Sequence, residues 1–163
     1  GNTLEKLKWG VVPSWSKKKD FKALINARLE TIDEKISFKK LIKLHRCVAV
    51  ADGFYEWKRE EKNKTPYYFF REDKKTVYIA GIYENNEFCL ITESASENVK
   101  TIHHRQPVIL NEGDINRYLN LELSGSNFLR ESKKTKLSFY EVSKDVNKPT
   151  NNSISLIQKK ESK

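Results

Sequence analysis

The chain has 163 residues, a formal net charge of +9 and two cysteines. This length suits one domain with a core of its own, and the cysteines have neither a disulfide-framework nor a zinc-binding spacing. We find no signal peptide and no run of about 18 apolar residues, so we expect a soluble protein of a reducing, intracellular compartment. Residues 1–50 hold 12 Lys/Arg against 5 Asp/Glu, which indicates a polyanionic partner such as nucleic acid, or else only a solvated lysine-rich surface.

The first elements are predicted to be a strand, a loop and a second extended segment. Alternating apolar residues predict a strand over residues 1–12, which Pro13 ends. Trp15 then lies in a loop beside three lysines, where it could stack on a nucleic-acid base or fold back over the core. Asn26 and Arg28 alternate with apolar neighbours, so both would point to one side of an extended chain. Together they could bind a phosphate, or they could be an ordinary turn Asn and surface Arg.

The stretch 47–58 carries the strongest local signal. Its first five residues are small and apolar, which predicts a strand packed on both faces. Gly53 predicts a kink, because glycine reaches backbone angles that other residues avoid. Beyond the kink, alternation places Phe54 and Glu56 on one face and aromatic residues on the other.

Glu56 is therefore a carboxylate flanked by three aromatic side chains. Such a group loses hydration and could hold a proton near neutral pH, which would make Glu56 a general acid or base. The alternative is a solvated glutamate at a strand end, paired with Lys58 or Arg59.

The other elements are predicted from short apolar runs separated by polar turns. We expect a helix from a Ser37 cap to about His45, strands over 67–71, 77–83, 88–92 and 137–142, a hairpin turn at 72–75, short helices over 94–102 and 114–121, and a loop at 124–126. The consecutive strands would form an antiparallel meander.

Residues 103 to 105 combine two histidines with an arginine between a helix and a strand. Metal binding would need a third ligand at a suitable spacing, and the sequence offers none. One surface histidine and one buried, hydrogen-bonded histidine are the ordinary alternative.

Six motifs occur together in one order along the chain. They are Trp-Gly-Val-Val-Pro-Ser-Trp (9–15), Asn-Ala-Arg-Leu-Glu-Thr (26–31), Ala-Asp-Gly-Phe-Tyr-Glu-Trp-Lys (51–58), Ala-Gly-Ile-Tyr (80–83), Ile-His-His-Arg-Gln-Pro-Val-Ile-Leu (102–110) and Val-Ser-Lys-Asp-Val-Asn (142–147). With these motifs the chain resembles the SOS response-associated peptidase (SRAP) domain. The resemblance implies a β-rich α+β fold of mostly antiparallel strands in a partly open barrel with short flanking helices. It also implies a single domain over 1–147 and a polar tail over 148–163.

The resemblance implies an enzyme of the DNA-damage response that senses abasic sites in single-stranded DNA. In that family, autoproteolytic removal of the initiator Met exposes an N-terminal Cys, whose amine and thiol form a thiazolidine crosslink with the opened sugar. A terminal amine is partly neutral near pH 8, and a positioned proton donor speeds imine formation. The implied protein is a cytoplasmic monomer that needs no cofactor, no metal and no membrane.

The resemblance also assigns roles to individual residues. The catalytic positions are Asn26 near the terminal amine, Glu56 as acid and base, and His103 for sugar opening and reversal. The DNA-binding positions are Trp15 for stacking and Arg28 and Arg105 for phosphates. His104 has no implied role and is expected to be structural.

The sequence departs from the family pattern at its start. It begins Gly1-Asn2-Thr3, so the segment with the crosslinking Cys is expected to be missing through truncation. Cys47 and Cys89 have no free α-amine and fall in strand-like runs, so neither is expected to replace it. The alternative is a module that binds single-stranded DNA without crosslinking.

Overall fold

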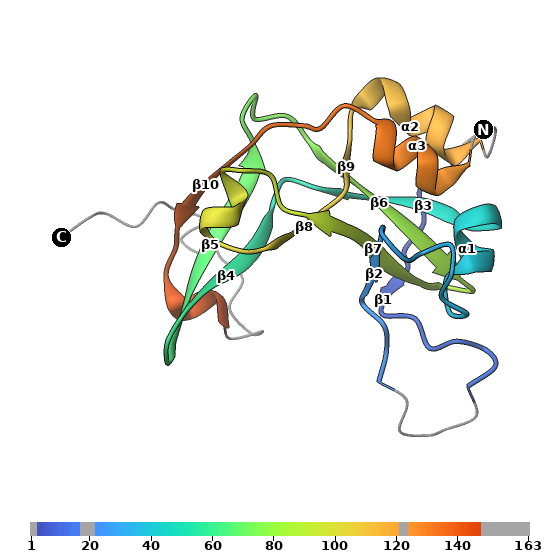
Figure 1. The fold of residues 1–163 in the computed structure, drawn as a ribbon, viewed down its shortest axis with the longest axis horizontal. Helices are drawn as coiled ribbons and strands as arrows, with labels where there is room; N and C mark the ends of the chain where they lie inside the picture. Colours follow the sequence, from blue (N-terminus) through green and yellow to red (C-terminus); the bar gives the residue numbers. More distant parts are fainter. Residues whose placement is uncertain (1–2, 17–21, 121–123, 148–163) are drawn as a thin grey trace. The chain divides into compact units, whose positions relative to one another are not determined.

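The computed structural model describes residues 3–16, 22–120 and 124–147 (Figure 1). The described residues form an α+β fold of two sheets and short helices, with mostly antiparallel strands and no closed barrel among them, which confirms the predicted fold class. The chain divides into two compact units. The first unit comprises Gly1–Val50, Tyr78–Glu93 and Pro107–Thr135, and the second comprises Ala51–Val77, Ser94–Gln106 and Lys136–Lys163. The predicted polar tail and the lysines after Trp15 lie outside the described residues.

The first unit is built on a seven-stranded mixed sheet. The strands of this sheet are β1 (Lys8–Trp9), β2 (Asn26–Arg28), β3 (Arg46–Ala51), β6 (Val77–Glu84), β7 (Glu87–Ser94), β8 (Arg105–Pro107) and β9 (Ile109–Leu110), and of β8 only Pro107 belongs to the first unit. The central order is β1-β7-β6-β3, and β6 and β7 form the antiparallel hairpin expected from their apolar runs. β1 and β2 instead pair with β7 in parallel. The strand predicted over residues 1–12 is limited to two residues, because Gly10 turns the chain at a φ of +125°.

Three helices share one apolar core with this sheet (Figure 1). They are α1 (Lys39–Leu44), α2 (Glu112–Leu119) and α3 (Gly125–Glu131). α3 contradicts the predicted loop at 124–126, because Phe128 and Leu129 bury their side chains and so favour a helix. The predicted Ser37 cap is also wrong, since Phe38 occupies the N-cap position of α1 without a side-chain bond. No described helix is long and apolar enough to cross a bilayer.

Two polar side chains inside this core, Arg46 and Tyr118, donate to backbone oxygens. The buried Arg46 donates to the carbonyl of Ile42 at 2.7 Å and to that of Tyr118 at 3.0 Å. The Tyr118 hydroxyl, itself fully buried, donates to the carbonyl of Gly81 at 2.8 Å. Burial raises the pKa of Tyr118 well above its ordinary value, so the hydroxyl keeps its proton. These bonds tie α1 and α2 to β3 through Arg46, and α2 to β6 through Tyr118.

The second unit is built on a three-stranded antiparallel sheet in the order β10-β5-β4. Its strands are β4 (Phe54–Glu60), β5 (Asn63–Arg71) and β10 (Leu137–Glu141), and two short 3-10 helices, η1 (Val99–Thr101) and η2 (Lys144–Asn147), complete it. η1 is shorter than the helix predicted over 94–102. Aromatic rings meet across the strands: Phe54 and Phe69 are stacked at 5.2 Å between ring centroids, and Phe69 and Phe139 are tilted at 5.1 Å. Such cross-strand pairs stabilise the sheet and set its register.

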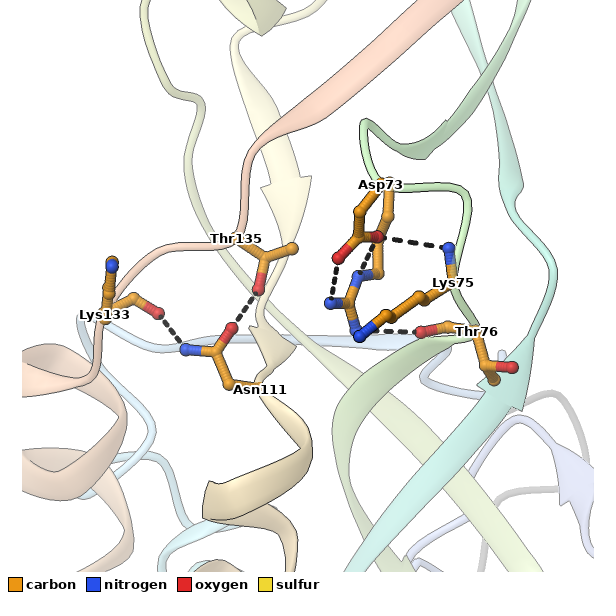
Figure 2. A network of polar contacts seen from close by, with 7 residues as sticks. Asp73, Lys75, Thr76, Asn111, Lys133 and Thr135 are labelled. Carbon is orange, nitrogen blue, oxygen red and sulfur yellow. Dashed lines mark hydrogen bonds and ion pairs between the residues drawn. The ribbon is translucent and has the colours of Figure 1, made fainter.

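The predicted meander is wrong between β5 and β6, which lie in different sheets. β5 has both edges occupied by β4 and β10, so neither edge is free for β6. The intervening turn is closed instead by Arg71, a buried guanidinium that donates to the Asp73 carboxylate at 3.0 and 2.7 Å and to the Thr76 carbonyl at 3.1 Å (Figure 2). The hydrogen bonds from Arg71 lower the pKa of Asp73. The turn is therefore self-contained and lets the chain leave the three-stranded sheet.

A second small network lies within the first unit, ahead of α2. The Asn111 side chain accepts from the Thr135 hydroxyl at 2.8 Å and donates to the carbonyl of Lys133 at 3.1 Å (Figure 2). It therefore ties the start of α2 to the segment that follows α3.

The stretch 47–58 also differs from its prediction. Its two halves are β3 and β4, which belong to different sheets. β3 is not packed on both faces, since Val50 is 58% exposed. The expected kink at Gly53 is instead a break between two strands, and its φ is not in the positive range. A Cβ at Gly53 would lie 2.3 Å from the Phe69 carbonyl oxygen, so glycine is required by close approach.

Candidate functional site

A cavity of about 300 Å³ lies in the second unit at the edge of β4. Glu56, Trp57, Arg59, Lys64 and His103 line it. The first four come from the β4–β5 hairpin, and the histidine comes from the segment after η1. The cavity therefore collects two titratable groups, two cations and an indole ring, which are the kinds of group that bind and process a charged ligand.

Glu56 is positioned by the register of β4. It lies directly opposite Tyr67 on the same face as Phe54, as alternation predicted. One carboxylate oxygen, Oε1, accepts the main-chain N–H of Trp57 at 3.2 Å and lies 3.6 Å from Nε2 of His103. The two side chains are 28% and 22% exposed, so both are partly shielded but still reachable from solvent. This arrangement suits the transfer of a proton between a bound molecule and the pair.

The alternative partner for this carboxylate was a neighbouring cation on the same strand. Lys58 instead lies 2.8 Å from Glu60, on the face of β4 that both share. The hydrogen bond that Lys58 donates to Glu60 raises the pKa of Lys58. Lys58 therefore already has an acidic partner, and the contact that the structure gives Glu56 is with His103.

His103 is oriented by its own segment. Nδ1 of His103 lies 3.1 Å from the main-chain nitrogen of Arg105 and 3.2 Å from the carbonyl oxygen of the same residue, so it accepts from the first or donates to the second according to its tautomer. In the tautomer in which Nδ1 accepts, the ring proton is on Nε2, the nitrogen that faces Glu56. The His104 ring stacks on the His103 ring at 4.7 Å between centroids and holds its plane, which agrees with a structural role for His104. Ile102, which is buried, anchors the segment.

The other predicted residues lie on the first unit. Asn26 and Arg28 flank the buried Ala27 on β2, so both side chains are exposed on one side of the strand, as predicted. Arg28 lies 3.5 Å from Glu30 and remains 63% exposed, so this surface ion pair holds it weakly. Trp15 is 53% exposed, which argues against its predicted alternative as a cover for the core.

The structure thus brings Glu56 into contact with His103, and His103 with the backbone of Arg105, within the second unit. The first unit carries the asparagine, the arginine and the tryptophan of the sequence prediction. Arg59 and Lys64 were not singled out from the sequence. Their signal is positional, because alternation from Trp57 places Arg59 on the same side of β4.

Neither cysteine is a candidate nucleophile. Cys89 is buried and Cys47 is partly buried, and burial raises the pKa of each thiol to about 12. Few thiolates therefore exist near neutral pH. Over the described ranges, no three His, Cys, Asp or Glu side chains are grouped so that they could hold a metal ion.

Comparisons with known proteins agree with the motif pattern. The family model described as SOS response associated peptidase (SRAP) matches residues 1–149. Abasic site processing protein YoqW of Bacillus subtilis is 36% identical over 172 residues, covering 96% of this chain and 77% of that protein. Abasic site processing protein YedK of Escherichia coli is 30% identical over 168 residues, covering 95% and 74%.

A solved structure supports the same assignment. A protein from Bacteroides thetaiotaomicron aligns with a TM-score of 0.79 at 27% identity, covering 94% of this chain and 75% of that one. The expected resemblance is thereby confirmed by both sequence and fold. The chain belongs to the SOS response associated peptidase family.

Proposed function

We propose that this protein recognises abasic sites in single-stranded DNA and that Glu56 and His103 carry the proton transfers at the opened sugar. The observation that supports this most is the 3.6 Å contact between Glu56 Oε1 and His103 Nε2 in a cavity reachable from solvent. Relatives named abasic site processing proteins and the +9 charge of the chain agree with a DNA partner.

The proposed chemistry is the formation of a thiazolidine between an N-terminal Cys and the aldehyde of the opened sugar. The amine adds to the aldehyde and water leaves, giving an imine. The thiol then adds to the imine carbon, and its proton passes to the nitrogen, so no oxidant or reductant is needed. Proton donation to the departing water and removal of a proton from the attacking amine are tasks for a carboxyl–imidazole pair.

The remaining predicted residues complete the proposal. Asn26 would orient the terminal amine, Arg28 and Arg105 would bind phosphates, and Trp15 would stack on a base. The crosslinking Cys would belong to a segment ahead of Gly1, because both cysteines of this chain are internal and their thiols are protonated.

The test uses a longer form of the protein whose sequence ahead of Gly1 begins Met-Cys. It should form a denaturation-resistant adduct with abasic single-stranded DNA. Glu56→Gln should slow adduct formation or reversal by about 10²-fold while changing the Kd little, since general acid–base catalysis contributes 10²- to 10⁴-fold. Glu60→Gln is the matched control, because Glu60 lies on the same face of the same strand. An adduct that survives replacement of the terminal Cys by Ala would refute the proposal.

A second candidate is a module that binds single-stranded DNA without covalent chemistry. It is favoured by the burial of Cys47 and Cys89, which keeps both thiols protonated. Such a module should bind abasic and intact oligonucleotides equally well, with a strong dependence on salt. A preference for the abasic oligonucleotide by the 163-residue chain would count against it.

A further inference from the structure

Two like charges face each other across the hairpin that forms the site. In the register of β4 and β5, Arg59 lies directly opposite Lys64. Like charges in such a pair destabilise a sheet, and both of these residues are exposed; every other pair of this hairpin contains at most one charged residue. The arrangement is therefore unfavourable in the free protein and would be relieved by a bound anion.

The protein's own carboxylates do not supply that anion. Glu60 is the nearest acid along β4, and it is paired with Lys58 at 2.8 Å on the opposite face of the strand. Over the described ranges, neither Arg59 nor Lys64 forms an ion pair. Both cations are therefore available to a ligand of negative charge.

The position of Arg59 and Lys64 indicates which kind of anion they would bind. Arg59 and Lys64 line the same cavity as Glu56 and His103. Arg59 is three residues from Glu56 along an extended strand, a separation of about 10 Å, and alternation starts the two side chains on opposite faces of β4. Both nevertheless line the one cavity at this edge. A ligand whose reacting atom lies at the carboxyl–imidazole pair would therefore carry its negative charge a short distance away. A sugar of a polynucleotide has this form, because its phosphates flank it on both sides.

We propose that Arg59 and Lys64 together bind a phosphate that flanks the abasic sugar, as a contact additional to those of Arg28 and Arg105. This inference rests on the proposed function of the Glu56–His103 pair. The two cations would fix the register of the DNA strand on the edge of β4, so that the sugar and not a neighbouring base enters the cavity.

The experiment measures binding of the 163-residue chain to labelled single-stranded oligonucleotides by fluorescence anisotropy over a range of salt concentrations. One oligonucleotide carries a central stable abasic analogue, and others add an uncharged methylphosphonate at a single position on either side of it. The variant is Arg59→Thr/Lys64→Thr, which keeps β-branched residues on the strands. The matched control is Lys39→Ala/Lys40→Ala, which removes two exposed lysines from α1.

The variant should bind the abasic oligonucleotide about fivefold more weakly at 0.1 M salt, because one phosphate contact to a single strand changes the salt slope by about 0.7. A methylphosphonate at one of the positions should weaken binding by the wild-type chain by the same factor and leave binding by the variant unchanged. The variant should be at least as stable as the wild type in urea, since it loses a repulsion. The control should keep the wild-type slope.

Other outcomes overturn the inference. The phosphate contact is excluded if the Arg59/Lys64 variant keeps the wild-type salt slope, or if the control variant loses as much affinity as the Arg59/Lys64 variant does. It is also excluded if every methylphosphonate still weakens binding of the Arg59/Lys64 variant. If the wild-type chain does not distinguish abasic from intact DNA, the proposed function itself fails and this inference fails with it. If the wild-type chain prefers abasic to intact DNA and the Arg59/Lys64 variant binds both as the wild type does, this inference fails and the proposed function stands.

Discussion

Gly53 is the residue whose replacement tests most directly how the site is positioned. It precedes β4, and an added Cβ would lie 2.3 Å from the Phe69 carbonyl oxygen and 2.6 Å from the Tyr68 ring. A real Cβ essentially never comes within 3.0 Å of such atoms. The tyrosine ring could rotate, but the carbonyl belongs to the central strand of the sheet and cannot. Gly53→Ala therefore forces the start of β4 away from β5.

The size of the effect follows from that displacement. Restoring ordinary contact requires a shift of about 1 Å, and overpacking of this kind costs about 1–3 kcal/mol. Because the obstacle is a main-chain atom, and because the Phe54–Phe69 ring contact at 5.2 Å is disturbed as well, we expect the upper end, about 3 kcal/mol.

Urea unfolding followed by circular dichroism measures this cost, with the m-value showing whether the unfolding transition itself has changed. Gly113→Ala is the matched control, since nothing lies within 4 Å of a Cβ at that helical position. It should stabilise the protein by about 0.5–1 kcal/mol, because alanine favours the helix and restricts the unfolded chain. A loss below about 1 kcal/mol for Gly53→Ala would refute the argument that close approach of the Phe69 carbonyl requires glycine here.

Three further predictions concern charge and thiol chemistry. Arg28→Ala should weaken binding of abasic and intact single strands alike and lower the salt slope by about 0.7, whereas the similarly exposed Arg117→Ala should leave the slope unchanged. Both cysteines should react with iodoacetamide roughly a thousandfold more slowly in the folded protein at pH 8 than in urea, because their raised pKa leaves few thiolates until the pH nears 12; fast labelling of the folded chain would contradict this. Lys134→Met should cost about 2 kcal/mol in urea unfolding, because it leaves the mostly buried Glu93 carboxylate without the ammonium that lies at 2.6 Å; unchanged stability would exclude that pairing.

The elements that could be predicted from the sequence are those fixed by local alternation. The faces of β4 and the extended conformation of β2 follow from period two alone, so the positions of Glu56, Asn26 and Arg28 within their strands are as expected. The strand over 137–142 was also anticipated within one residue. In each case neighbouring residues along the chain determine the outcome.

The wrong predictions concern elements whose structure depends on contacts between residues far apart in the sequence. Nothing local indicates that β5 has both edges occupied, so the turn after Arg71 was taken for a hairpin. The two strands on either side of Gly53 were joined into one for the same reason. Helix α3 was missed because its two apolar anchors, Phe128 and Leu129, follow a Ser-Gly-Ser-Asn run that is typical of a loop.

The residues that line the cavity depend partly on local sequence pattern and partly on contacts between distant parts of the chain. Glu56, Trp57 and Arg59 lie within four residues, and Lys64 follows from the hairpin register once the turn is known. His103 comes from far along the chain, and only the motif pattern linked it to the carboxylate before the structure placed the two at 3.6 Å. Alternation along β4 places Glu56 on one face and Trp57 and Arg59 on the other, so the cavity at this edge strand is lined from both faces of the hairpin. The acid–base pair is therefore fixed by local alternation on one side and by the distant segment that carries His103 on the other.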